Sequence, residues 1–453
     1  MQLLTCARRS FRRFVLPGVF AVTGVLSTAS SCQPMRHPRQ GRDALLLTDV
    51  NVVDVSSGAI LEHLDLLIAN GKIAELGPRG SVQSPRGTVV LDQAGRFVIP
   101  GLIDMHAHLS DEDDAPRMLS YGITAARQMA DVPWWTRALM GFPDGRDLRD
   151  RIMRGELQGP DLLVAGRVLD GEPPISPLNQ VVTDTAKARK IVARQAADGY
   201  DIIKVYDHLS APVFETVLAE AARRHVLVAG HVPVAVGIDR ALTSTMTSIE
   251  HVTGYVDQHH VKFLFDEQRI REYAERTKAS GMVNCPTLVV WRNIPPRDSL
   301  KLLERQPEFR HLSWRIRWLW KTTLGYLAKK PYQGTDLAGD MTRLTVTMTR
   351  ALYEAGAPIV AGTDMNFLGV YPGISLHQEM EFLRDAGLSD LDALRAATIN
   401  AAKALGLERA IGSIEVGKRA NLVILSANPL LDIRATRKIH DVIKNGNRVP
   451  KIM

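Results

Sequence analysis

The chain has 453 residues, of which 45% are hydrophobic and 23% are charged, and its formal net charge is +7. This composition is typical of a globular protein that is long enough for one large domain or two smaller ones. Four of the positive charges, Arg8, Arg9, Arg12 and Arg13, fall in a segment that has the features of a removable signal. The remaining charge of about +3 does not suggest a nucleic-acid partner.

Residues 1–31 have the pattern of an export signal peptide. A basic stretch (ARRSFRR) precedes an apolar run and several small residues that end at Cys32. Two export routes stay open, because the RRSF stretch resembles a twin-arginine signal while the rest fits a general secretory signal. The stretch Ala29-Ser30-Ser31, which precedes Cys32, resembles a lipoprotein box, so Cys32 is a candidate site for a lipid that anchors the chain to a membrane. We therefore expect a periplasmic or cell-envelope protein in which residues 32–43 form a polar tether.

Residues 44–100 contain alternating apolar segments that predict antiparallel strands, with turn signals such as Asn70-Gly71 between them. From residue 101 the pattern changes to short apolar strands that alternate with amphipathic helices. A strand carries His106, and the further strand candidates are residues 122–129, 161–168, 201–206, 226–232, 247–251, 282–290 and 358–364.

Eight strand-and-helix units predict an α/β fold with a (β/α)₈ TIM barrel over residues 101–405. After residue 406 the hairpin-like strands return, with an Asn445-Gly446 turn near the C-terminus. We expect residues 44–100 and 406–453, from the two ends of the chain, to form one small β-sandwich domain beside the barrel.

Residues 291–335 interrupt the unit after the seventh predicted strand. Four of the six tryptophans lie here, and residues 291–330 contain ten Lys or Arg against three acidic residues. One interpretation is a lid or cap that packs over the barrel mouth, and another is a helix that contacts a membrane surface. Because the insertion enters from the face where catalysis is expected, we take it as a candidate source of substrate selectivity.

Polar residues punctuate the apolar strands where a barrel of this type places its catalytic groups, at the carboxyl ends of strands. His106 and His108 are one residue apart, so their side chains point to the same face of a strand. A single histidine at a strand end is more often structural, but several that converge with a carboxylate favour a divalent metal such as Zn²⁺. The candidate ligands are His106, His108, Lys204, His231, His251 and Asp364.

Lys204 needs a separate explanation, because an isolated ammonium between Ile203 and Val205 would be costly to bury. Three interpretations stay open from the residues alone. The amine could pair with a carboxylate, it could be neutral with a lowered pKa, or it could react with CO₂ to form a carbamate. A carbamate is a bidentate anion and could bridge two metal ions.

Five motifs in this order resemble the amidohydrolase superfamily, and more narrowly its imidazolonepropionase-like and prolidase-like dipeptidase branch. The motifs are PGLIDMHAH, the strand-borne Lys204, GH at 230–231, IEH at 249–251 and GTD at 362–364, and the resemblance covers residues 45–449. It implies a binuclear centre of two divalent ions, expected to be Zn²⁺, bridged by carboxylated Lys204 and a hydroxide.

The resemblance also implies a role for each candidate ligand. His106, His108 and Asp364 would hold the first metal ion, and His231 and His251 would hold the second. Asp364 would act as general base toward the bridging hydroxide and then as general acid toward the leaving amine.

We therefore expect a metal-dependent amidohydrolase that cleaves a C–N bond of a small molecule, a dipeptide or an N-acyl amino acid. The residues that follow His231 and His251 depart from the commoner family pattern, which leaves the substrate less defined. Candidate substrate contacts are Tyr206, Tyr255 and His208. Two alternatives are a lactonase or organophosphate-type hydrolase of C–O or P–O bonds on the same dimetal centre, and a non-catalytic envelope binding protein.

Overall fold

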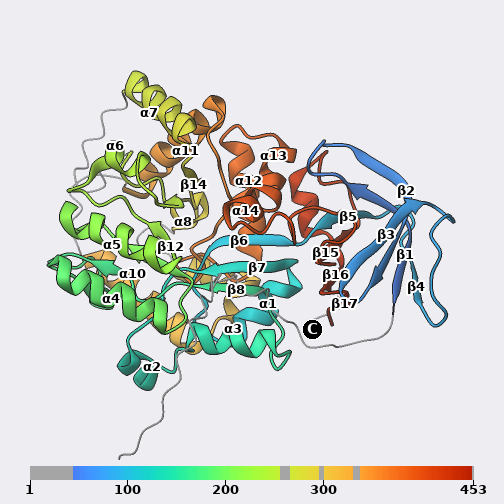
Figure 1. The fold of residues 1–453 in the computed structure, drawn as a ribbon, viewed down its shortest axis with the longest axis horizontal. Coiled ribbons are helices and arrows are strands. Elements are labelled where there is room, and N and C mark those ends of the chain that lie inside the picture. The colour runs from blue at the N-terminus through green and yellow to red at the C-terminus, as the bar shows by residue number, and fades with distance from the viewer. Residues whose placement is uncertain (1–43, 256–265, 295–299, 330–336, 451–453) are drawn as a thin grey trace, which may run out of the picture. The chain divides into compact units, whose positions relative to one another are not determined.

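The computed structural model describes residues 44–450 except 256–265, 295–299 and 330–336 (Figure 1). The predicted signal peptide and the tether lie outside the described residues. Within the described ranges, no helix combines the length and the apolar character that crossing a bilayer requires.

Strands from both ends of the chain form one sheet, in the order β17-β16-β15-β5-β1-β2-β3 with β4 paired to β1. β15 runs antiparallel to β5 and places Val423 opposite Ile99, which joins the two chain ends. The pairing is continuous from β17 to β3, and the sandwich of two facing sheets stays a prediction. The strands are β1 (Leu45–Val53), β2 (Ile60–Ala69), β3 (Lys72–Pro78), β4 (Val89–Asp92), β5 (Phe97–Pro100), β15 (Leu422–Leu425), β16 (Ile439–Lys444) and β17 (Asn447–Arg448).

The turns of this sheet follow the sequence signals. Asn70 and Gly71 connect β2 to β3, and both have positive φ angles (53° and 74°), as a two-residue hairpin turn that matches the twist of the strands requires. Asn445 and Gly446 connect β16 to β17 with similar angles of 50° and 79°. The exact domain boundaries stay predictions.

The middle of the chain forms two parallel sheets, one of order β6-β7-β8 and one of order β10-β9-β11-β12-β13-β14. Strands β11 and β12 are buried over nearly their whole length, and so they read as apolar runs. The strands are β6 (Leu102–Ala107), β7 (Ile123–Gln128), β8 (Asp161–Val164), β9 (Leu169–Asp170), β10 (Gln180–Val181), β11 (Ile202–Val205), β12 (Leu227–Gly230), β13 (Ser248–Glu250) and β14 (Val283–Cys285).

Helices alternate with these strands, as expected for an α/β fold (Figure 1). The helices are α1 (Asp114–Ser120), α2 (Trp134–Met140), α3 (Gly145–Met153), α4 (Thr185–Ala197), α5 (Ala211–Arg224), α6 (Gly237–Leu242), α7 (Glu267–Ser280), α8 (Leu288–Asn293), α9 (Leu300–Glu304), α10 (Trp314–Lys329), α11 (Leu337–Ala355), α12 (Ile374–Asp385), α13 (Asp390–Ala396) and α14 (Ile399–Ala404), with the 3₁₀ turns η1 (Pro307–His311) and η2 (Ile433–Arg437).

Helix α5 shows why the sequence folds in this way. Pro212 lies in its first turn, where a missing N–H costs nothing, and apolar side chains recur at helical spacing. Phe214 and Val217 are among the residues of this face that are buried in the main core. Ser210 occupies the N-cap position, but its side chain makes no capping hydrogen bond.

Single bridges and backbone hydrogen bonds join the edges of the two parallel sheets. Ala165, which follows β8, pairs with Ile202 of β11, and Ile359 pairs with Asn284 of β14. On its other side, the 359–361 segment accepts a hydrogen bond from the β6 amide of Met105 to the carbonyl of Ala361 (3.0 Å). The assigned sheets are open at these points, so the closed eight-stranded barrel stays a prediction.

Two strand predictions need correction. The predicted strand over residues 282–290 ends at Cys285, and helix α8 follows at Leu288. Thr287 turns the chain with a φ of 50°, and the buried Glu379 carboxylate accepts the free amides of Leu288 and Val289 at 3.0 and 2.7 Å. The predicted strand over 358–364 is reduced to the single bridge at Ile359.

The predicted insertion begins inside α8 and continues, in its described part, through α9, η1 and α10. One face packs against the segment that follows Asp364, in a cluster of Leu303, Phe309, Leu312, Ile316, Trp320, Leu368, Tyr371 and Ile374. The indole Nε1 of the buried Trp320 donates to the carbonyl of Asn366 at 3.0 Å. The insertion is therefore anchored to the loop that carries Asp364.

A buried ionic cluster connects the terminal sheet to β8. The Asp161 carboxylate lies 2.6 Å from Nζ of Lys444 and 3.0 Å from Nη1 of Arg419, and all three side chains are largely shielded from water. Burial lowers the pKa of Lys444, and the charge of Asp161 opposes this. The negative charge of Asp161 therefore stabilises the buried ammonium of Lys444.

We predict that Asp161→Ala lowers the free energy of unfolding by about 3–5 kcal/mol, because it leaves the buried Lys444 ammonium without its partner. Urea-induced unfolding followed by circular dichroism measures the change. The matched control is Glu156→Ala, which removes an exposed pair with Arg154 and is expected to leave the unfolding midpoint unchanged. Equal shifts in the two variants would contradict the prediction.

Candidate active site

The first predicted metal ligands meet at the carboxyl end of β6. His106 is fully buried, whereas the His108 side chain is 29% exposed. The Nε2 atoms of His106 and His108 lie 3.5 and 2.9 Å from Oδ1 of Asp364. Ligand atoms of these three residues all lie within 4.8 Å of one another, which is close enough for one metal ion.

Asp364 is held in this position by its own backbone. Its amide donates to the carbonyl of His106 at 2.7 Å, and its φ of 58° is a left-handed conformation that non-glycine residues rarely adopt. Burial disfavours ionisation of its carboxyl, but the hydrogen bond from His108 and the electrostatic influence of the neighbouring imidazoles outweigh burial and hold the pKa of Asp364 well below its usual range. Asp364 is therefore an anion beside the histidines.

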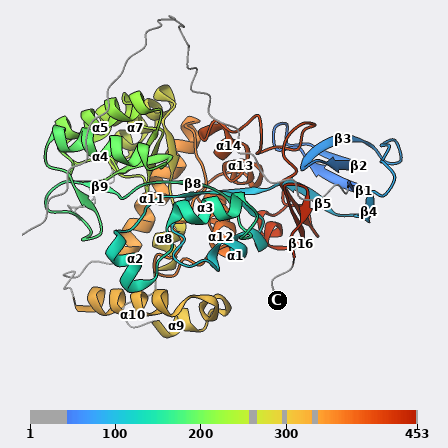
Figure 2. The ribbon, with the colours of Figure 1, turned by 60° about the horizontal axis from the view of Figure 1, so that its bottom comes forward.

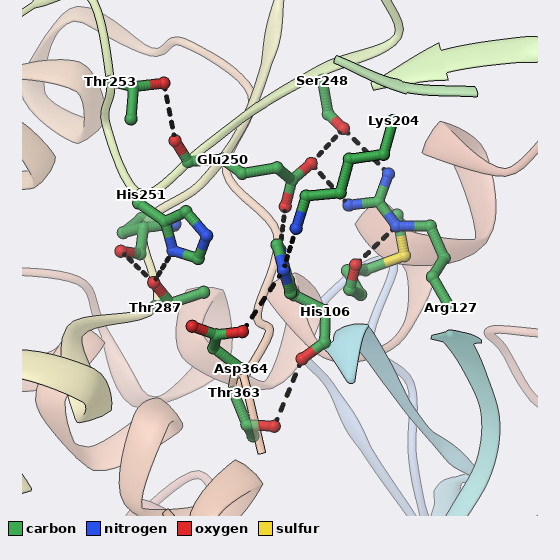
Figure 3. A network of polar contacts seen from close by, with 12 residues as sticks. His106, Arg127, Lys204, Ser248, Glu250, His251, Thr253, Thr287, Thr363 and Asp364 are labelled. Atoms are coloured by element: carbon green, nitrogen blue, oxygen red, sulfur yellow. Dashed lines mark hydrogen bonds and ion pairs between the residues drawn. The ribbon is translucent and has the colours of Figure 1, made fainter. Parts of the chain in front are cut away.

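Lys204 projects from β11 into the same cluster and is 2% exposed. Its Nζ lies 2.9 Å from Nε2 of His106 (Figure 3). Burial lowers the pKa of Lys204, while the charges of Asp364 and Glu250 oppose this. Burial makes the charged form of Lys204 less favourable than in water, and the three interpretations open from the sequence stay open.

His231 and His251 follow β12 and β13. Nδ1 of His231 lies 2.7 Å from Oδ2 of Asp207, and Nδ1 of His251 lies 2.6 Å from Oγ1 of Thr287. Burial lowers the pKa of His251 to about 3, so this imidazole is neutral. Among the described residues, the buried Nε2 of His231 has no hydrogen-bond partner. The ring centroids of His231 and His251 are 5.1 Å apart.

A buried ionic network that the sequence analysis does not predict holds the Nδ1 atom of His106. Oε2 of Glu250 lies 2.7 Å from Nδ1 of His106, and Oε1 accepts from Nη2 of Arg127 at 2.8 Å (Figure 3). Ser248 bonds to both Glu250 and Arg127, at 2.5 and 2.8 Å. Glu250 therefore fixes the proton of His106 on Nδ1 and leaves Nε2 free to bind a cation.

The donor set fits a divalent metal centre. Three of the four histidines engage Nδ1 with an oxygen acceptor, from Glu250, Asp207 or Thr287, and this is the support that metal-binding histidines use. Their Nε2 atoms stay available inside the cluster, and neutral imidazole and carboxylate are the ligands that Zn²⁺ and similar ions prefer.

The three predicted substrate contacts lie in different places. The Tyr206 ring stacks on His231 with 3.7 Å between centroids, so it belongs to the cluster. The Tyr255 hydroxyl bonds instead to Thr277 of α7 at 2.9 Å. His208 uses Nδ1 in a hydrogen bond with the carbonyl of Pro173. Contact of these residues with a substrate stays a prediction.

Signals for the missed residues were present in the sequence. Arg127 is a cation inside the apolar run TAARQMA, and such a residue needs a buried partner. Glu250 directly precedes His251, and Asp207 directly follows the strand of Lys204. Their partners are far away in the chain, and for this reason a single sequence does not pair them.

Comparisons with known proteins agree with this geometry. A model of the amidohydrolase family matches residues 97–449, the range that contains every candidate metal ligand. The chain belongs to the amidohydrolase family. This confirms the resemblance drawn from the motifs.

Two solved structures show the same fold over most of their length. Bottromycin amidohydrolase is 28% identical, with a TM-score of 0.71 over 91% of this chain and 88% of that chain. A candidate prolidase from Bifidobacterium longum is 25% identical, with a TM-score of 0.69 over 90% of this chain and 95% of that chain.

Curated relatives are more distant or match only in part. Ochratoxinase from Aspergillus niger is 24% identical over 438 residues, which cover 83% of this chain and 80% of that protein. Dihydroorotase from Geobacter metallireducens is 49% identical over 67 residues, and these span only 15% of each protein.

We predict that Glu250→Gln lowers the affinity for Zn²⁺ by about 10- to 100-fold, because the carboxylate that orients His106 is lost. Competition with a chromophoric chelator on metal-stripped protein measures the affinity. The matched control is Glu220→Gln, which removes a glutamate that is paired with Arg224 on α5, outside the cluster. An unchanged affinity in a folded Glu250→Gln variant would contradict the role of Glu250 in positioning His106.

Proposed function

We propose that this chain is a metal-dependent hydrolase that cleaves the C–N bond of a small amide, a dipeptide or an N-acyl amino acid. The observation that carries the proposal is the gathering of four histidines, a buried lysine and an ionised aspartate from separate strand ends into one cluster. Membership of the amidohydrolase family and the likeness to a candidate prolidase support an amide substrate.

The eight predicted strands would form a closed (β/α)₈ barrel around this cluster. The bridges at Ala165 and Ile359 and the hydrogen bond from Met105 to Ala361 support the closure. In such a barrel the carboxyl ends of all strands share one rim, which is where the candidate ligands lie.

His106, His108 and Asp364 would hold one divalent ion, and His231 and His251 would hold a second. Two such ions lower the pKa of a shared water toward neutrality and polarise the substrate carbonyl. Nζ of Lys204 lies 2.9 Å from Nε2 of His106, so a carbamate on Nζ would lie beside the ligands of the first ion. The lowered pKa of its amine supports that modification, because only a neutral amine attacks CO₂.

Asp364 would act as the proton carrier. As an anion that His108 contacts at 2.9 Å, it can accept a proton from the attacking water and pass it to the departing nitrogen. The amine is a poor leaving group until it is protonated, so one carboxylate serves both halves of the reaction. Its backbone hydrogen bond to His106 keeps it beside the ligands throughout.

Substrate choice would depend on Tyr206 and on the insertion. Tyr206 covers one face of His231, and Trp320 fixes Asn366, whose side chain donates to the carbonyl of His108 at 2.8 Å. Through these contacts the insertion is connected to the loop that follows Asp364 and to His108.

We predict that Asp364→Asn lowers kcat by about 10²- to 10⁴-fold in metal-replete protein, because the amide cannot carry the proton. Steady-state kinetics on the best amide substrate, together with metal content per chain, measure the effect. If the variant binds the full complement of metal and keeps wild-type kcat, the general-base assignment is wrong.

We predict that metal-stripped protein regains activity only when bicarbonate and Zn²⁺ are added together, because Lys204 needs CO₂ to form a carbamate. Carbon-13 NMR with labelled bicarbonate detects the new carbonyl carbon, and Lys204→Met provides the control that lacks it. Full recovery with Zn²⁺ in carbonate-free buffer would show that the amine acts unmodified.

We predict that Trp320→Phe lowers kcat about tenfold at unchanged metal content, because the carbonyl of Asn366 loses its buried donor. The matched control is Trp314→Phe, which changes an exposed tryptophan of the same helix and is expected to keep wild-type kcat. Steady-state kinetics measure kcat of both variants. Equal kcat values for the two would argue against the anchoring role of Trp320.

A further inference from the structure

Exposed apolar side chains gather around the insertion. Of fifteen large apolar residues that are exposed in the described part of the chain, eight belong to α2, α9, α10 and the loop after Asp364. They are Trp134, Trp135, Leu139, Leu302, Trp314, Trp318, Leu319 and Phe367. An accumulation of this kind, four tryptophans included, is uncommon on a surface that faces only water.

Helices α2 and α10 lie side by side (Figure 2). Gly141, which ends α2, packs against the guanidinium of Arg315, because a Cβ built there would lie 3.1 Å from Nη2. Phe142, the next residue, packs against the apolar cluster that anchors the insertion. We call Trp134, Trp135, Leu139, Trp314, Trp318 and Leu319 the tryptophan surface.

The two faces of α10 have different roles. Ile316 and Trp320, four residues apart, are buried against the segment that follows Asp364. Trp314 and Trp318, also four residues apart, are 62% and 51% exposed, so the core does not use them. Anchoring the insertion therefore explains one apolar stripe of α10 and leaves the other outside the apolar core of the described residues, with the guanidinium of Arg315 beside the Trp314 ring.

The charge around the tryptophan surface is positive. Residues 300–322 contain six Lys or Arg and two Glu. Lys301, Arg305, Arg310 and Lys321 are exposed. Protein interfaces are generally depleted of lysine, whereas tryptophan beside lysine and arginine is the combination that interfacial helices place at the headgroup level of a bilayer. The positive charge complements anionic lipid headgroups.

We propose that the tryptophan surface docks the folded protein on the surface of an anionic phospholipid bilayer. The indole rings would enter the headgroup region, and the surrounding cations would bind lipid phosphates. Phe367, three residues after Asp364, is 39% exposed in the same region, so the docking surface adjoins the catalytic loop. The proposal does not depend on the proposed hydrolysis.

The test uses the full chain and vesicles of phosphatidylcholine that contain about 30% of the anionic lipid phosphatidylglycerol. Four of the six tryptophans of the chain belong to the tryptophan surface, and the other two, Trp291 and Trp320, are partly or fully buried, so quenching from the bilayer reports mainly on this surface. Lipids brominated on the acyl chain quench indoles that enter the bilayer. We expect quenching that weakens in 0.5 M salt (about a 4 Å screening length) and with pure phosphatidylcholine.

Variants separate the tryptophan surface from other routes to the membrane. Trp314→Gln with Trp318→Gln is expected to lower the vesicle partition coefficient about tenfold or more. The matched control is Val89→Gln with Val90→Gln, two exposed apolar residues of β4 in the terminal sheet, which is expected to keep wild-type partitioning. Circular dichroism and metal content confirm that both variants are folded.

Each other outcome overturns the proposal. Vesicle binding without quenching would place the membrane contact elsewhere in the chain. The absence of vesicle binding would contradict a membrane contact of any kind. Self-association that requires Trp314 and Trp318, measured by light scattering in the absence of vesicles, would assign the surface to a second copy of the chain instead.

Discussion

The hydrogen bond between Nδ1 of His106 and Oε2 of Glu250 spans 2.7 Å in an interior from which water is excluded. A buried carboxylate is costly unless it is paired, and Arg127 and Ser248 supply the remaining partners of Glu250. Because the proton of His106 is fixed on Nδ1, its Nε2 faces Lys204 and Asp364. The orientation of His106 toward the other candidate ligands of the first ion therefore depends on this hydrogen bond.

The same device recurs around the cluster. Asp207 fixes His231 and Thr287 fixes His251, so each imidazole presents Nε2 to a common interior. Burial lowers the pKa of His106, of His251 and of the Lys204 amine, without any further structural element. The fold contributes by bringing short parallel strands together so that their carboxyl ends meet, and by tying Asp364 to the strand of His106.

The candidate ligands could be predicted because each ends an apolar strand, and strand ends converge in a parallel α/β fold. Glu250 and Arg127 could not be paired with His106 from one sequence, since Glu250 is 144 residues away from it. Helix α8 was predicted as a strand because LVVW is an apolar run that fits either state. The segment is a helix because the carboxylate of Glu379, which is distant in the sequence, accepts the first helical amides.

The insertion illustrates a different limit. Its tryptophans and cations were visible in the sequence, but whether a given apolar residue faces the core or the solvent depends on what packs against the helix. Trp320 and Trp318 are two positions apart and have opposite environments, 1% and 51% exposed. The contacts of Trp320 with Phe309, Tyr371 and Asn366 distinguish the two positions.

Elemental analysis of metal content per chain, paired with a turnover screen over a library of dipeptides and N-acyl amino acids, tests the central claim most directly. About two divalent ions per chain, with hydrolysis of at least one amide, are expected for a binuclear amidohydrolase. One ion per chain would contradict the assignment of His231 and His251 to a second site. Two ions without turnover of any amide, but with hydrolysis of a lactone or an organophosphate, would contradict the C–N bond as the substrate.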